Sequence, residues 1–170
     1  YGEDLVSATL YGSAAGGDFN PQHSDINLLM VLREASLPEV ERSLKLQKKW
    51  AKSRVSRLLF MDPAYLASSL DTFPIEFLNM RGCYQVLLGS DVLGELSIKR
   101  PDVRLQVERE LKGKRLHLMQ RWLAARESGR QAKELADISL KDFAATFRAL
   151  LFLRDLQSPR DRTPIFAEVE

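Results

Sequence analysis

The sequence lacks several features that would point to whole classes of function. Its single cysteine, Cys83, excludes an internal disulfide and any zinc site built from several cysteines. No apolar run approaches the length of a membrane span, and no secretory signal is evident. From these absences we expect a cytoplasmic protein without a membrane partner.

An excess of one sign of charge is also lacking. Lysine and arginine number 25 and aspartate and glutamate 23, which leaves a net charge of +2. A chain this close to neutral gives no electrostatic reason to expect a nucleic-acid partner. Its 170 residues, 45% of them hydrophobic, fit one globular domain or a small domain with a helical extension. Because it begins at Tyr1 rather than Met, we expect it to be trimmed or a fragment of a longer protein.

The most informative stretch begins as an apolar segment that ends in a Gly-Ser turn. Residues 5–11 are predicted to form a strand, and Gly12 and Ser13 follow it at once. A small turn of this kind lets backbone N–H groups approach a polyphosphate closely. The eleven residues 14–24, which include Gly, Asn, Pro and Gln, then predict a loop or a short helix that breaks early.

A carboxylate opens the second strand of this stretch. Residues 26–32 are almost wholly apolar, which is typical of a central strand buried on both faces. Asp25 stands directly before them. Positions 25 and 27 are the first and third residues of an extended segment, so their side chains point to the same face. Asp25 and Asn27 therefore lie side by side, as two metal ligands must.

These residues resemble a known family. The pattern Tyr11-Gly12-Ser13-Ala14, followed by Ser24-Asp25-Ile26-Asn27-Leu28, is similar to the signature of the DNA polymerase beta-like nucleotidyltransferase superfamily. The sequence of these two segments is most similar to the small bacterial branch of the superfamily, which includes aminoglycoside adenylyltransferases and minimal nucleotidyltransferases.

The resemblance implies a role for each of these residues. Asp25 and Asn27 are the expected ligands of Mg²⁺, and Gly12 and Ser13 the expected contacts of the nucleotide phosphates. The implied reaction transfers AMP from ATP to a hydroxyl of a small molecule or protein and releases pyrophosphate. The expected partners are thus a nucleoside triphosphate and a hydroxyl acceptor that the residues do not identify.

Glu76 is the candidate for a third carboxylate. It is the charged residue of the segment 74–77, within residues 75–80 that we predict to form the fourth strand. An unpaired buried carboxylate costs several kcal/mol, so such a residue has either a partner or a function. Aminoglycoside adenylyltransferases carry a similar proline–apolar–glutamate strand, and the resemblance makes Glu76 a general base or a metal ligand. The alternative is a salt bridge to Arg57 or Arg81.

Position 27 leaves the activity open, because the family pattern has an acid where this chain has Asn27. An amide brings no negative charge, so a second metal ion would be held less well. One interpretation is an adenylyltransferase that works with one ion or at low efficiency. The alternative is a non-catalytic nucleotide-binding or regulatory module with a degenerate metal site. A third hypothesis, by family analogy, is a toxin–antitoxin partner.

The order of predicted elements indicates an α+β fold. We expect a small mixed sheet of about four strands flanked by helices, in a nucleotidyltransferase-like domain over residues 1–92. A helix is predicted over 37–52 and a third strand over 55–61. Asp62 and Pro63 then open a short helix as its cap and its first residue.

After Gly82 the chain changes to helices, and we assign residues 93–170 to a C-terminal helical domain. Apolar residues spaced by fours and sevens predict helices over 102–125 and 139–156 that pack antiparallel. Trp50 and Trp122 lie on apolar helix faces and are expected in the core. The many basic side chains of the helices are interpreted as a solvated surface.

Overall fold

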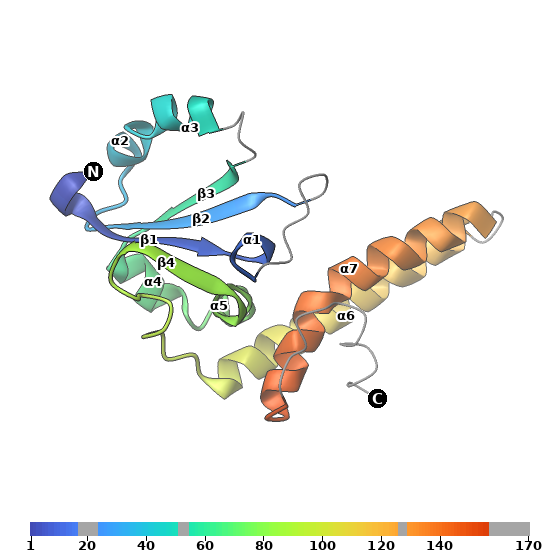
Figure 1. Cartoon of the computed structure of the whole chain (residues 1–170). Helices are drawn as coiled ribbons and strands as arrows, with labels where there is room; N and C mark the ends of the chain where they lie inside the picture. Colours follow the sequence, from blue (N-terminus) through green and yellow to red (C-terminus); the bar gives the residue numbers. More distant parts are fainter. Residues whose placement is uncertain (17–23, 51–54, 126–128, 157–170) are drawn as a thin grey trace. The chain divides into compact units, whose positions relative to one another are not determined.

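The computed structural model describes residues 1–16, 24–50, 55–125 and 129–156, without the side chains of Ser56, Arg57 and Lys141. The chain forms two compact units. One consists of Tyr1–Leu70 and Met80–Ser97, and the other of Asp71–Asn79 and the chain from Ile98 onward. The first contains a sheet and the second a pair of long helices (Figure 1). The fold class is therefore α+β, as the sequence predicts, whereas the domain boundary after residue 92 stays a prediction.

Four strands form one mixed sheet in the order β3-β2-β1-β4. A short 3-10 helix, η1 (Gly2–Asp4), leads into the first of them. The strands are β1 (Leu5–Tyr11), β2 (Ile26–Leu32), β3 (Val55–Met61) and β4 (Tyr84–Gly89). β1 is antiparallel to both β2 and β4, and β2 is parallel to β3. The predicted bounds of the first three strands are confirmed.

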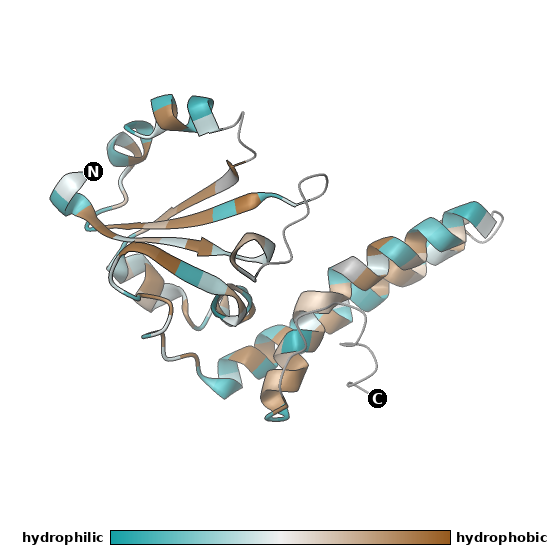
Figure 2. Cartoon of the chain, viewed as in Figure 1, coloured by the Kyte–Doolittle hydropathy of each residue, from teal (hydrophilic) through white to brown (hydrophobic). Residues whose placement is uncertain are grey.

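The core of this unit is built around β2. Its five residues Leu28–Leu32 are all buried, because β2 lies inside the sheet and is covered on both faces. Figure 2 shows the apolar colour concentrated on the strands. Two hydroxyls are buried on β1 beside it, and Ser7 and Thr9 satisfy each other through a hydrogen bond of 3.1 Å.

The prediction of a strand over residues 75–80 is wrong. Helix α5 (Pro74–Gly82) occupies this segment. The fourth strand is β4, which begins at Tyr84 after the helix has ended. The apolar–charged–apolar sequence Ile75-Glu76-Phe77 fits a strand in so short a window. The helix forms because Pro74 is its first residue, where a missing N–H costs nothing, and because Ile75 and Phe77 are both buried by tertiary packing.

The single helix predicted over 37–52 is divided. α2 (Leu37–Glu41) ends at Arg42, and α3 (Leu44–Trp50) follows and lies beside β3, whereas residues 51 and 52 are outside the described residues (Figure 1). Ser43 marks the break, since it is buried and donates its hydroxyl to the Val40 carbonyl at 2.7 Å. A serine bonded back to its own helix in this way bends or ends the helix.

Helix α4 (Pro63–Ser69) begins as predicted. The Asp62 carboxylate accepts the Tyr65 N–H at 2.7 Å, and Pro63 is the first helical residue. The same carboxylate accepts the Ala35 N–H at 3.4 Å, which ties the helix start to the segment after β2.

The Asp62→Ala substitution is expected to destabilise the first unit by about 1 kcal/mol, because it leaves an N-terminal amide of α4 without its acceptor. Chemical denaturation of the full chain measures this loss. Asp62→Asn is the matched control, since asparagine caps helices about as well and gives up only the 3.4 Å hydrogen bond from the Ala35 N–H, so its loss of stability should be clearly smaller. Equal losses in both variants would show that the cap is not the cause.

The second unit contains a helical hairpin. α6 (Arg100–Ala125) and α7 (Gly129–Leu153) pack against each other. Val103 and Val107 of α6, Ile75 of α5 and Ala149 of α7 form its buried cluster. α6 agrees with the prediction, but α7 begins well before Ser139, so the predicted helix start there is wrong.

Trp122 is not a core residue, contrary to the sequence prediction, because 54% of its surface is exposed. It lies near the end of α6, beyond the Val103–Val107 part of the helix that the cluster buries. Within the described residues, no helix is both long and apolar enough to cross a membrane.

Candidate nucleotide site

The turn after β1 requires glycine. Gly12 has φ +81°, a backbone conformation that other residues rarely adopt. Its carbonyl accepts the Ala15 N–H at 2.9 Å, which starts the short helix α1 (Ser13–Gly16). The Gly12 N–H donates to the Cys83 carbonyl at 2.9 Å. That N–H is therefore engaged within the protein, and the exposed Ser13 supplies the polar side chain of the turn.

Asn27 lies directly against this turn. It is the second residue of β2 and pairs with Tyr11, the last residue of β1. A Cβ atom placed on Gly12 would be 3.3 Å from Asn27 Nδ2, so the amide fills the space above the glycine. The antiparallel pairing of β1 and β2 thus brings two predicted site residues together at one end of the sheet.

Asp25 stands at the same end of β2. It precedes the first strand residue, Ile26, and is exposed. Its carboxylate makes no hydrogen bond or ion pair with the described part of the chain. A carboxylate that supports no local structure remains available for a ligand.

A basic residue lies opposite Asn27 on the other neighbouring strand. The parallel register pairs Asn27 with Arg57 of β3, after an irregularity next to Ile26. From the sequence, Arg57 is expected only as an alternative salt-bridge partner of Glu76. Its position depends on the strand register. The one sign of it in the sequence is that a charged residue stands within an otherwise apolar strand.

Tyr84 completes this end of the sheet, because it pairs with Tyr11 from the β4 side. Its hydroxyl donates to the Asp91 carboxylate at 2.9 Å, and this hydrogen bond is the main reason that the pKa of the phenol is raised. The Tyr84 hydroxyl therefore stays protonated here.

Glu76 belongs to the other compact unit. It is an exposed residue in the first turn of α5, and not a strand residue as predicted. Among the described side chains its partner is Gln106 of α6, whose Nε2 donates to Glu76 Oε2 at 2.8 Å, and not Arg81. The predicted alternative partner Arg57 has a side chain outside the described residues. The sequence does not predict this role of Gln106. Its one indication there is the position of Gln106 beside the apolar Val107.

The side chains at this end of the sheet include the types of oxygen donor that a magnesium ion takes. Mg²⁺ is commonly held by one or two protein oxygens, with water and phosphate oxygens completing its six ligands. Asp25 offers a carboxylate without a partner in the described ranges, and Asn27 a neutral amide oxygen two residues later. In the described residues no three His, Cys, Asp or Glu side chains are grouped closely enough to hold a metal ion.

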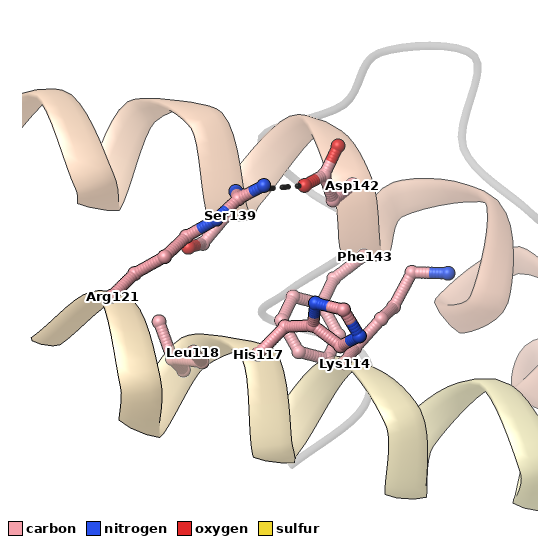
Figure 3. A pocket seen from close by; sticks show the side chains of 7 residues that line it. All are labelled: Lys114, His117, Leu118, Arg121, Ser139, Asp142 and Phe143. Carbon is pink, nitrogen blue, oxygen red and sulfur yellow. Dashed lines mark ion pairs between the residues drawn. The ribbon is translucent and has the colours of Figure 1, made fainter.

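A small cavity of about 130 Å³ lies between α6 and α7 (Figure 3). Lys114, His117 and Arg121 line it from α6, and Ser139, Asp142 and Phe143 from α7. Its charges are already paired, Arg121 with Asp142 at 3.8 Å and Lys114 with Glu110 at 2.5 Å. We therefore do not assign a catalytic role to this cavity.

Comparisons with known proteins add a structural likeness. No protein-family model matches the chain, and no curated protein matches it. Among solved structures, the chain is similar to spectinomycin adenyltransferase AAD(9) from Enterococcus faecialis, crystallised with ATP and spectinomycin. The match has 12% identity and a TM-score of 0.43 and covers 99% of this chain and 91% of that one. At this TM-score the likeness carries no conclusion about this chain.

Proposed function

We propose that this chain is a nucleotidyltransferase-like protein that binds ATP and Mg²⁺ at the turn after β1 and transfers AMP to a hydroxyl group. The single observation that supports the proposal best is the meeting of Gly12 and Asn27 beside Asp25, whose carboxylate has no partner among the described residues. A tight hydroxyl-bearing turn next to such a carboxylate is suited to a triphosphate with its metal ion.

Each residue of the proposal has a distinct task. Ser13 would bind phosphate oxygens through its hydroxyl, and Asp25 with Asn27 would hold the ion. A bound magnesium ion supplies charge neutralisation and polarisation of the phosphate. As the acceptor oxygen bonds to the α-phosphorus, its proton goes to a general base, and Glu76 is the candidate for that role by the resemblance alone. The bond to the β-phosphate breaks, and pyrophosphate leaves.

A second candidate function is nucleotide binding without transfer. One observation favours it, namely the neutral Asn27 in place of a carboxylate. The amide lowers the negative charge at this end of the sheet, and holding a second metal ion for transfer depends on that charge.

The Asn27→Asp substitution separates the two candidates. We expect wild type to release pyrophosphate from ATP with spectinomycin or a tyrosine- or serine-containing peptide as acceptor. The variant should do so about 10- to 100-fold faster, because a second carboxylate strengthens the metal site. A coupled pyrophosphate assay measures both rates, with calorimetry reporting ATP affinity.

The matched control is Gln120→Glu, which adds the same charge at an exposed position of α6 and should leave the rate unchanged. If the wild-type chain binds ATP with magnesium but releases pyrophosphate only after Asn27→Asp, the second candidate function is correct.

A further inference from the structure

We propose that Gln106 is a positioning residue that holds the Glu76 carboxylate in one orientation. This inference rests on the proposed function, in which Glu76 takes a proton from the acceptor hydroxyl. Both residues belong to the same compact unit, so their geometry is internal to it.

The Gln106 amide is buried, and each of its two polar atoms has a hydrogen-bond partner. The residue is only 4% exposed, and its Oε1 accepts the Ile75 N–H at 2.8 Å while its Nε2 donates to Glu76 Oε2 at 2.8 Å. A buried amide needs such partners at both ends. Gln106 thereby ties the first turn of α5 to α6 through two bonds.

These two bonds allow only one orientation of the amide. The Ile75 N–H can only donate, so the atom facing it must be the carbonyl oxygen of Gln106. The NH₂ group is then necessarily directed at the Glu76 carboxylate. The usual ambiguity between the oxygen and nitrogen of a glutamine side chain does not arise here.

The side chain is also held by packing. Val103 and Val107, which flank Gln106 on α6, are 0% and 4% exposed and contact the buried cluster with Ile75. A side chain packed in this way cannot change rotamer without disturbing the core. The position of the NH₂ group is therefore as well defined as the core itself.

The arrangement leaves half of the Glu76 carboxylate available. Oε2 is engaged by Gln106, whereas Oε1 has no hydrogen bond to the described residues. Glu76 is an exposed residue, and the proposal takes Oε1 as the atom that meets the substrate. A carboxylate anchored at one oxygen and open at the other is pre-organised for proton transfer.

The Gln106→Glu variant tests this role. It keeps an acceptor for the Ile75 N–H but directs a second negative charge at Glu76 in place of a donor. We expect kcat for AMP transfer in the full chain to fall about 10- to 100-fold with KM for ATP unchanged, because a displaced base loses its alignment. On a Glu76→Gln background the same substitution should lower kcat no further.

The exchanged double variant, Glu76→Gln with Gln106→Glu, separates positioning from a structural role. Its two side chains restore both hydrogen bonds in reversed form, so thermal stability should return to the wild-type value while transfer stays low. Recovery of transfer in this variant, unchanged kcat in Gln106→Glu alone, or equal loss on both backgrounds would each overturn the proposal.

Absence of transfer in wild type would refute the proposed function, and a second readout then decides the positioning claim. The side-chain NH₂ protons of Gln106 should give NMR signals protected from solvent exchange. Those signals should shift when Glu76 is replaced by alanine. NH₂ signals that exchange freely with solvent, or that do not shift in the Glu76→Ala variant, would show that Gln106 does not hold the carboxylate.

Discussion

The Asp25→Ala variant is expected to lose the magnesium-dependent part of ATP binding. Its affinity for ATP with Mg²⁺ should fall by about 100-fold or more, since even outer-shell partners of metal ligands typically contribute 10- to 100-fold. Calorimetric titration with ATP, with and without Mg²⁺, measures this loss. The fold should remain intact, because Asp25 is exposed and has no partner in the described part of the chain.

The matched control for this variant is Glu34→Ala, which removes an equally exposed carboxylate just beyond the other end of β2. Its ATP affinity should equal that of wild type, since it lies at the end of the strand away from Gly12. If both variants lose affinity alike, general charge and not a ligand role explains the effect. If neither loses it, the site is elsewhere.

The Glu76→Gln variant should keep ATP binding and lose transfer. A general base contributes about 10²- to 10⁴-fold to a rate, and an amide of the same shape cannot take the acceptor proton. The loss is expected in kcat and not in the affinity for ATP. Single-turnover measurement of AMP transfer, together with the ATP titration, separates these two quantities.

Glu134→Gln, an equally neutralising change at an exposed position of α7, serves as its control and should leave transfer unchanged. Full activity in Glu76→Gln would remove Glu76 from the chemistry while leaving nucleotide binding at the turn untouched. Loss of ATP binding in that variant would instead favour a role in holding the nucleotide.

The sheet could be predicted where burial dictates the sequence. β2 is buried on both faces, so its residues 28–32 have to be apolar. The same requirement for apolar residues makes the ends of β1 and β3 predictable. β4 is an edge strand with four exposed residues, and its sequence carries little of that pattern. The fourth strand predicted from the sequence therefore falls on residues of α5, whose Ile75 belongs to the buried cluster of the second unit.

The candidate site was predictable only in its local part. Gly12 and Asn27 meet because β1 and β2 pair antiparallel, which their apolar pattern and short connection suggest. Arg57 pairs with Asn27 in the parallel register of β3, and that register includes an irregularity that no local pattern encodes. Gln106 reaches Glu76 across 30 residues through the packing of α6 on α5, so its role depends on tertiary structure.

A crystal structure of the full chain with Mg²⁺ and a non-hydrolysable ATP analogue tests the central claim most directly. The account predicts phosphate oxygens within hydrogen-bond distance of the Ser13 hydroxyl and a metal ion bound to the Asp25 carboxylate. A nucleotide bound away from the turn after β1, or an ion held without Asp25, would contradict it.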